Sequence, residues 1–239
     1  QLTAMFNYAV KYYDLHENPC TKAGSMGKSH AEEMNFWTKA EFEQFIVAVQ
    51  DKPASYTAFM TLYYTGMRVG ELCALTPADV NLVGHTITIN KTFQRINGRD
   101  VIWPPKTPKS NRVVTIPQTL ANCLKEYMDK CYEIQPDDRL FPYTKSFLNH
   151  EMLRGCKKSG VKKIRVHDLR HSHAILLIEM GCQPLLIADR LGHEKIQTTL
   201  NTYSHLYPNK QAEVAAQLEN VMNGTTVPNG SQMAGVANL

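Results

Sequence analysis

The chain has 239 residues, an apolar fraction of 43% and a formal net charge of +4. This predicts a globular protein with one large domain or two small ones, and the mild basic charge suits an anionic partner without demonstrating one. No apolar run approaches the ~20 residues of a membrane span and no secretory signal opens the chain, so we expect a cytoplasmic protein.

The cysteines also bear on the class of protein. The sequence holds six of them without any CxxC pair, and several lie in apolar helical contexts. Buried thiols in a reducing compartment are the simplest interpretation, and the pattern disfavours a disulfide scaffold. The first residue is Gln instead of Met, which indicates that the sequence begins inside a longer protein.

The first third of the chain predicts helices with clear ends. Apolar residues at helical spacing over 2–15 predict one helix that stops before the Asn-Pro of "HENPC", and residues 21–35 have the composition of a linker. Thr38 and Glu41 form a capping box that opens the next domain. A second helix, "ASYTAFMTLYYT", stops at Gly66, and "MRVGELCALT" begins another.

The periodicity then changes from helical to alternating. Residues 85–116 predict a small antiparallel sheet, with the Asn-Gly pair at 97–98 as a type I′ turn and "PPKTPKSN" as a Pro-rich turn. Helical patterns return over 118–133, 146–158, 168–180, 184–191, 196–205 and 209–222, and a flexible tail follows. The predicted fold class is therefore mainly α with a small antiparallel β-sheet (α+β).

Four stretches carry candidate chemistry, and each has an ordinary structural explanation when taken alone. Arg68 in "TGMRVGEL" has the spacing of a surface ion pair with Glu71, and Lys106 in the hairpin turn "KTPKSNR" is a typical charged turn residue. In "HDLRHSHA", His167 and His171 have helical zinc spacing, but no third ligand is evident. Alternatively, His167 and Arg170 face one side of a helix and address one anion.

The fourth stretch is "IADRLGHEKIQTTLNTYSH", which contains His193 and Tyr203. Its first part is similar to the middle of a helix-turn-helix, so a non-catalytic DNA-binding regulator is an alternative function. That alternative explains the basic charge but leaves Arg68, Lys106 and Arg170 without a role.

In this order and at these separations, the four stretches resemble the catalytic motifs of the tyrosine recombinase (phage-integrase) family, most closely integrases of conjugative transposons. The resemblance covers about residues 36–207. It implies a tyrosine recombinase catalytic-domain fold over 36–208, the last helix of a truncated core-binding domain over 1–20, and a C-terminal helix with a flexible tail over 209–239.

The resemblance also assigns roles to single residues. It implies Tyr203 as the nucleophile, Arg68 and Arg170 as the ligands of the scissile phosphate, and Glu71 as a supporting acid. His193 would donate to the phosphate, His167 would take the proton of the phenol, and Lys106 would protonate the leaving oxygen. Lys109 lies in the same turn and is the alternative for that lysine. The implied catalytic set is Arg68, Lys106, His167, Arg170, His193 and Tyr203.

The reaction implied is the cutting and rejoining of DNA strands through a 3′-phosphotyrosine, without ATP, metal or other cofactor, to integrate or excise a mobile element. Two arginines replace the charge neutralisation that a metal supplies elsewhere. The implied partners are double-stranded DNA at element ends and target site, further copies of the chain as a dimer or tetramer, and an accessory DNA-bending or excision factor. Basic residues expected to contact DNA backbone are Arg95, Arg99, Lys109, Arg112, Lys162, Lys163 and Arg165.

Overall fold

The structure, a computed structural model, describes residues 2–24, 34–105 and 107–207, together with the single residues 215, 219 and 222. The chain divides into two compact units, residues 1–36 and 37–239. Lys106 and nearly all of the predicted helix 209–222 lie outside the described residues. No helix within these ranges is both long enough and apolar enough to cross a membrane.

The first unit contains two helices, α1 (Leu2–Tyr12) and α2 (Pro19–Ala23). Asn18 caps α2 by accepting the backbone N–H of Cys20, and its amide donates to the Thr3 carbonyl and the Asn7 side chain. The predicted end of the first helix is confirmed. The helix α2 is a difference from the sequence prediction, because it extends into the segment with linker composition.

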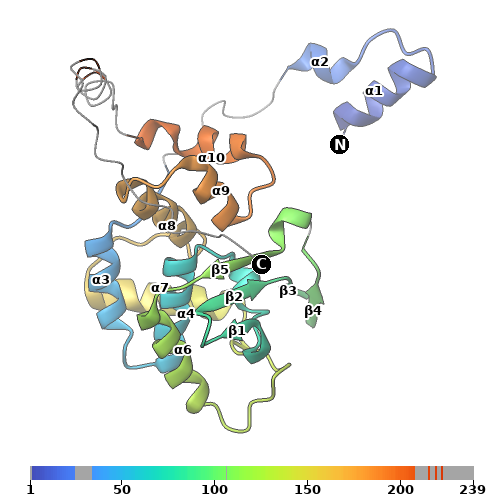
Figure 1. Cartoon of the computed structure of the whole chain (residues 1–239). Helices are drawn as coiled ribbons and strands as arrows, with labels where there is room; N and C mark the ends of the chain where they lie inside the picture. The colour runs from blue at the N-terminus through green and yellow to red at the C-terminus, as the bar shows by residue number, and fades with distance from the viewer. Residues whose placement is uncertain are drawn as a thin grey trace, which may run out of the picture. The chain divides into compact units, whose positions relative to one another are not determined.

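The second unit begins with three helices, α3 (Lys39–Ala48), α4 (Pro53–Thr65) and α5 (Val69–Leu72) (Figure 1). The capping box of Thr38 and Glu41 is present. Nine of the 13 residues of α4 are buried, because α4 packs against α3, α6 and α8. Gly66 ends α4 with a φ of 65°, a left-handed conformation that favours glycine.

The strands form two small antiparallel sheets. Strands β1 (Val80–Asn81), β2 (Thr86–Ile89) and β5 (Arg112–Thr115) pair in the order β1-β2-β5, while β3 (Thr92–Ile96) pairs with β4 (Arg99–Trp103). Asn97 and Gly98 have φ angles of 50° and 77°, as a type I′ turn requires. The antiparallel prediction is confirmed, but the single sheet is two sheets, and β1 lies before the predicted range.

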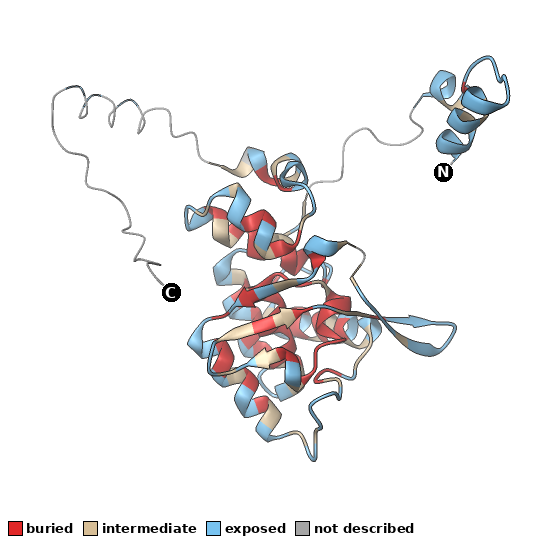
Figure 2. Ribbon diagram, turned by 45° about the vertical axis from the view of Figure 1, so that its right-hand side comes forward, coloured by how far each residue is buried: buried red, intermediate tan, exposed pale blue. Residues whose placement is uncertain are grey.

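Five α-helices follow between residues 118 and 203, and a short 3-10 helix comes directly after them over Ser204–Leu206: α6 (Gln118–Asp129), α7 (Lys145–Ser159), α8 (Asp168–Glu179), α9 (Pro184–Leu191) and α10 (Ile196–Tyr203). Their positions confirm the predicted helical segments. Figure 2 shows the buried residues of this unit gathered between the helices and the three-stranded sheet. The six cysteines are free thiols, but only Cys73 and Cys156 are buried, whereas the sequence predicted buried thiols in general; the other four are partly buried.

The contact between α3 and α7 is unusually close at Gly155. A Cβ added there would meet the Phe45 ring and, at 2.7 Å, the Val49 side chain. In an open helix a Gly to Ala exchange stabilises by about 0.5–1 kcal/mol. At this position we expect Gly155→Ala to destabilise the fold by about 1–3 kcal/mol, because Phe45 and Val49 must move. Urea unfolding measures this, with Lys157→Ala on the exposed side of α7 as the control; a stabilised Gly155→Ala variant would contradict the packing.

Candidate active site

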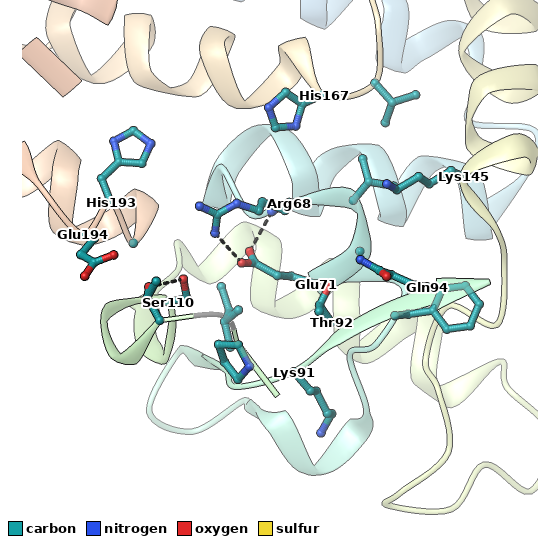
Figure 3. A pocket seen from close by; sticks show the side chains of 18 of the residues that line it. Arg68, Glu71, Lys91, Thr92, Gln94, Ser110, Lys145, His167, His193 and Glu194 are labelled. Carbon is teal, nitrogen blue, oxygen red and sulfur yellow. Dashed lines mark hydrogen bonds and ion pairs between the residues drawn. The ribbon is translucent and has the colours of Figure 1, made fainter. Parts of the chain in front are cut away.

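The cleft at the centre of the second unit has a volume of about 740 Å³. Figure 3 shows Arg68, His167 and His193 around this opening, and they come from three separate places in the chain. Arg68 precedes α5, His167 precedes α8, and His193 follows the turn at the end of α9. The fold therefore brings together three of the side chains that the sequence predicted for one site.

Glu71 organises one wall of the cleft. Its carboxylate accepts the Arg68 backbone N–H at 2.8 Å and the Arg68 guanidinium at 2.9 Å, and it receives two N–H groups of Arg112 at 2.9 and 3.2 Å. Burial acts to raise the pKa of Glu71, but the hydrogen bonds and charge of Arg112, followed by those of Arg68, outweigh burial and lower that pKa. Glu71 is therefore the anionic support of two guanidiniums.

Arg112 differs from its predicted role. Its side chain is only 6% exposed, and besides Glu71 it donates to the carbonyls of Arg190 and Ser110. All three nitrogens of its guanidinium donate to these protein groups, which argues against the backbone contact to DNA expected from the sequence. Arg112 instead joins β5, the turn before it and the end of α9 to Glu71.

Arg170 lies deeper in the same wall. It is 4% exposed and donates to the carbonyls of Gly66 at 2.8 Å and Leu191 at 2.6 Å, which fixes the guanidinium between α4 and α9. Burial, followed by the positive charges of Arg68 and Arg112, lowers the pKa of Arg170 to about 9. This position is crowded with positive charge, and an anion in the cleft would relieve that repulsion.

His193 follows the α9 cap residue Gly192, whose φ is 68°. Its Nδ1 lies 2.7 Å from the Thr199 hydroxyl, which comes from α10. Burial, followed by the charges of Arg170 and Arg68, lowers the pKa of His193 to about 4. The imidazole is thus neutral at pH 7 and has a fixed partner on one nitrogen.

Tyr203 ends α10 and is 1% exposed. Its hydroxyl oxygen lies 2.7 Å from Nδ1 of His171, so the imidazole that the phenol meets is His171 instead of His167, to which the sequence analysis gave the proton. His167 lines the cleft. The spacing of His171 from His167 indicated zinc and did not reveal this contact, although His171 directly follows the predicted phosphate ligand Arg170.

The zinc interpretation of His167 and His171 requires both imidazoles to converge on one point. Their rings instead meet edge to face with centroids 5.7 Å apart, and His171 turns Nδ1 toward Tyr203. This geometry disfavours the metal site. It favours an arrangement in which the two histidines address different groups.

The remaining predicted DNA-contact residues lie mostly on the surface. Arg95 pairs with Asp100 across the β3–β4 hairpin at 3.6 Å, and Lys162 pairs with Glu41 at 3.4 Å. Arg165 is 79% exposed although it pairs with Asp168, and it lines the cleft. The other three are also exposed: Arg99, Lys109 and Lys163. Lys145 and Asn149 of α7 line the cleft as well and were not singled out from the sequence.

Comparison with known proteins matches residues 35–210 to the phage integrase family model. The chain belongs to this family, as its motifs indicated. It is 33% identical to the ICEBs1 integrase of Bacillus subtilis (strain 168) over 92% of this chain, and spans 64% of that relative's length. It is 30% identical to the integrase of Staphylococcus phage L54a, covering 90% of this chain and 71% of the relative.

Solved structures show the same fold. The Tn1549 transposon integrase, determined in complex with circular intermediate DNA, matches with a TM-score of 0.74 and 22% identity, covering 92% of this chain and 76% of the other. XerA recombinase matches with a TM-score of 0.61 and 25% identity over 83% of this chain and 67% of the other. The predicted recombinase catalytic-domain fold is confirmed.

The buried carboxylate of Glu71 gives a test of the cleft wall. Glu71→Gln leaves Arg112 buried without its counter-charge, so we expect a loss of about 3–5 kcal/mol in the free energy of unfolding at pH 7. The folded pKa of Glu71 is lowered, so its ionisation stabilises the fold above about pH 4.3, and this contribution disappears as pH falls through the folded pKa.

The measurement is urea unfolding of the wild-type chain and Glu71→Gln between pH 7 and pH 3. The difference in the free energy of unfolding between the wild-type chain and Glu71→Gln should shrink as the pH falls into the acid range. Glu43→Gln, which removes a carboxylate from an exposed ion pair with Lys39, is the control and should change stability little. A difference that stays constant with pH would refute the role of the ionised carboxylate.

Proposed function

We propose that this chain is the catalytic part of a site-specific DNA recombinase that integrates or excises a mobile element. The observation that carries the proposal is the excess of positive charge at one cleft. Arg68, Arg112 and Arg170 surround one carboxylate, Glu71, and the phenol of Tyr203 is close enough to Arg170 for each to affect the pKa of the other. A phosphodiester supplies the missing negative charge and an atom for a phenol to attack.

In the proposed step, the Tyr203 oxygen forms a bond to phosphorus while the bond to the 5′ oxygen breaks, so the 3′ phosphate stays on the tyrosine. Arg68 and Arg170 hold the non-bridging oxygens, on which charge develops. Lys106 gives the 5′ oxygen its proton, with Lys109 as the alternative donor. The reverse attack by a 5′ hydroxyl rejoins the strands without ATP.

His193 fits the role of a neutral donor to the phosphate. When the Thr199 hydroxyl donates to Nδ1, the imidazole proton stays on Nε2, which then donates to an anion in the cleft. His167 lines the same cleft at the start of α8 and completes the set around the phosphate.

The proposed partner is double-stranded DNA, and relatives solved with DNA support it: the Tn1549 integrase and XerH recombinase bound to its difH substrate. We further propose that the chain acts on bacterial cytoplasmic DNA as a dimer or tetramer, aided by an accessory DNA-bending factor. This chain spans 64% of the length of the ICEBs1 integrase, so we propose the activity for the whole protein of which this chain is the catalytic part.

Tyr203→Phe should abolish covalent attachment while DNA binding persists, because only the attacking oxygen is removed. The assay traps the adduct on nicked suicide duplexes built from the ends of the element that carries the gene. Tyr207→Phe, four residues further on, is the matched control and should retain the adduct. An adduct formed by Tyr203→Phe would overturn the assignment of Tyr203 as the nucleophile. If the wild-type chain binds DNA specifically but forms no adduct, the alternative function of a non-catalytic DNA-binding regulator is favoured.

The proposed clamp is the pair of guanidiniums, Arg68 and Arg170, that holds the phosphate. Arg68→Lys tests this clamp better than a change at Arg170, whose guanidinium also donates to two backbone carbonyls. Arg68 is 39% exposed at the cleft. The variant keeps the charge but loses the forked donor geometry, so we expect cleavage about 10²–10³-fold slower in single-turnover assays. Arg95→Lys on the exposed hairpin is the control. Cleavage by Arg68→Lys within a few-fold of wild type would count against the clamp.

A further inference from the structure

Tyr203, the nucleophile of the proposed reaction, has an imidazole within hydrogen-bonding distance. The Tyr203 hydroxyl lies 2.7 Å from Nδ1 of His171, and the two rings have centroids 5.8 Å apart. This is the separation at which a general base takes a proton directly, without an intervening water. The contact joins α10, which ends at the nucleophile, to the first turns of α8.

The phenol needs such a base. Burial, partly offset by the charge of Arg170, raises the pKa of Tyr203 to about 12, so at neutral pH the hydroxyl keeps its proton. A protonated phenol is a weak nucleophile and must lose its proton as its oxygen bonds to phosphorus. The nearby guanidinium is already cationic and cannot accept that proton.

His171 has the properties of an acceptor. Burial, followed by the charge of His167, lowers its pKa, so the imidazole is neutral at pH 7. A neutral imidazole has one nitrogen lone pair for a proton, and Nδ1 is the nitrogen that faces the phenol. Arg170, the preceding residue, is fixed by two carbonyls, so one helical turn holds both the base and a phosphate ligand.

We propose that His171 is the general base that activates Tyr203, an assignment that rests on the recombinase function proposed above. As the Tyr203 oxygen bonds to phosphorus, its proton passes to Nδ1 of His171, and the 5′ oxygen leaves with a proton from the lysine of the proposed mechanism. On rejoining, the attacking 5′ hydroxyl returns a proton to that lysine as its oxygen bonds to phosphorus, and the imidazolium returns its proton to the phenolate as the phosphorus–tyrosine bond breaks. Each strand exchange thus ends with both groups in their starting states.

Under this assignment His167 and His171, one helical turn apart, have different roles in the reaction. His167 stands at the start of α8 and lines the cleft, where it meets the phosphate side of the reaction. His171 stands one turn later and meets the nucleophile. Their rings meet edge to face with centroids 5.7 Å apart, so the two imidazoles occupy different positions.

The substitution His171→Asn distinguishes a base from a holder of the tyrosine. The Asn amide reaches the place of Nδ1 and preserves a hydrogen bond to the hydroxyl, but it cannot accept a proton at neutral pH. We expect His171→Asn and His171→Ala to slow single-turnover cleavage alike, by about 10²–10⁴-fold. A His171→Asn variant near the wild-type rate, beside a slow His171→Ala, would reduce His171 to positioning and overturn the proposal.

A second measurement replaces Tyr203 by a fluorinated tyrosine whose phenol ionises near neutral pH. Such a phenol needs no base, so the defect of His171→Asn should fall to less than about 10-fold, while the defect of His167→Asn should persist. An equal His171→Asn defect with both phenols would overturn the proposal. Circular dichroism and DNA binding confirm that each variant is folded.

The outcomes also separate this proposal from the function on which it rests. If the wild-type chain forms no adduct on any element end, the recombinase function and the base fail together. If the wild-type chain forms the adduct through Tyr203 and His171→Asn forms it at the same rate, only the base fails.

Discussion

The pairing of the buried Glu71 carboxylate with Arg68 and Arg112 is the interaction on which the cleft depends. Arg68 directly precedes the short helix α5 that carries Glu71, whereas Arg112 comes from β5 and also donates to the end of α9. One carboxylate therefore ties together the segment that carries Arg68, the turn with Lys109 and the turn with His193. An intact buried charge pair adds little net stability, but the loss of one partner leaves a buried charge uncompensated and is costly.

The pairing of Glu71 with two arginines leaves an excess of positive charge in the cleft wall. Glu71 offers one negative charge against Arg68 and Arg112, and Arg170 has backbone carbonyls as its hydrogen-bond partners within the described residues. The lowered pKa values of Arg170 and His193 both follow from burial and from these guanidiniums. The fold thus keeps neighbouring cations in a position that favours a bound anion, and His193 remains a neutral donor.

Local patterns predicted much of the fold, because caps and tight turns depend on neighbouring residues. The Thr38 box, the Gly66 stop and the Asn97–Gly98 turn are all present. Partners distant in the chain were harder to predict. The spacing of basic residues could not show that Arg112 is buried against Glu71, 41 residues earlier. Nor could the alternating pattern show that β3 and β4 form a sheet separate from that of β1, β2 and β5.

The three histidines of "HDLRHSHA" show why residue type alone does not assign a site. Positions 167, 170 and 171 are three and four residues apart, so the helix turns them to one side. His173 faces the other side, where it is 2% exposed and accepts a hydrogen bond from Arg190. One imidazole meets the cleft, one the phenol and one the core, so the position of each histidine along α8 as well as around it decides its chemistry.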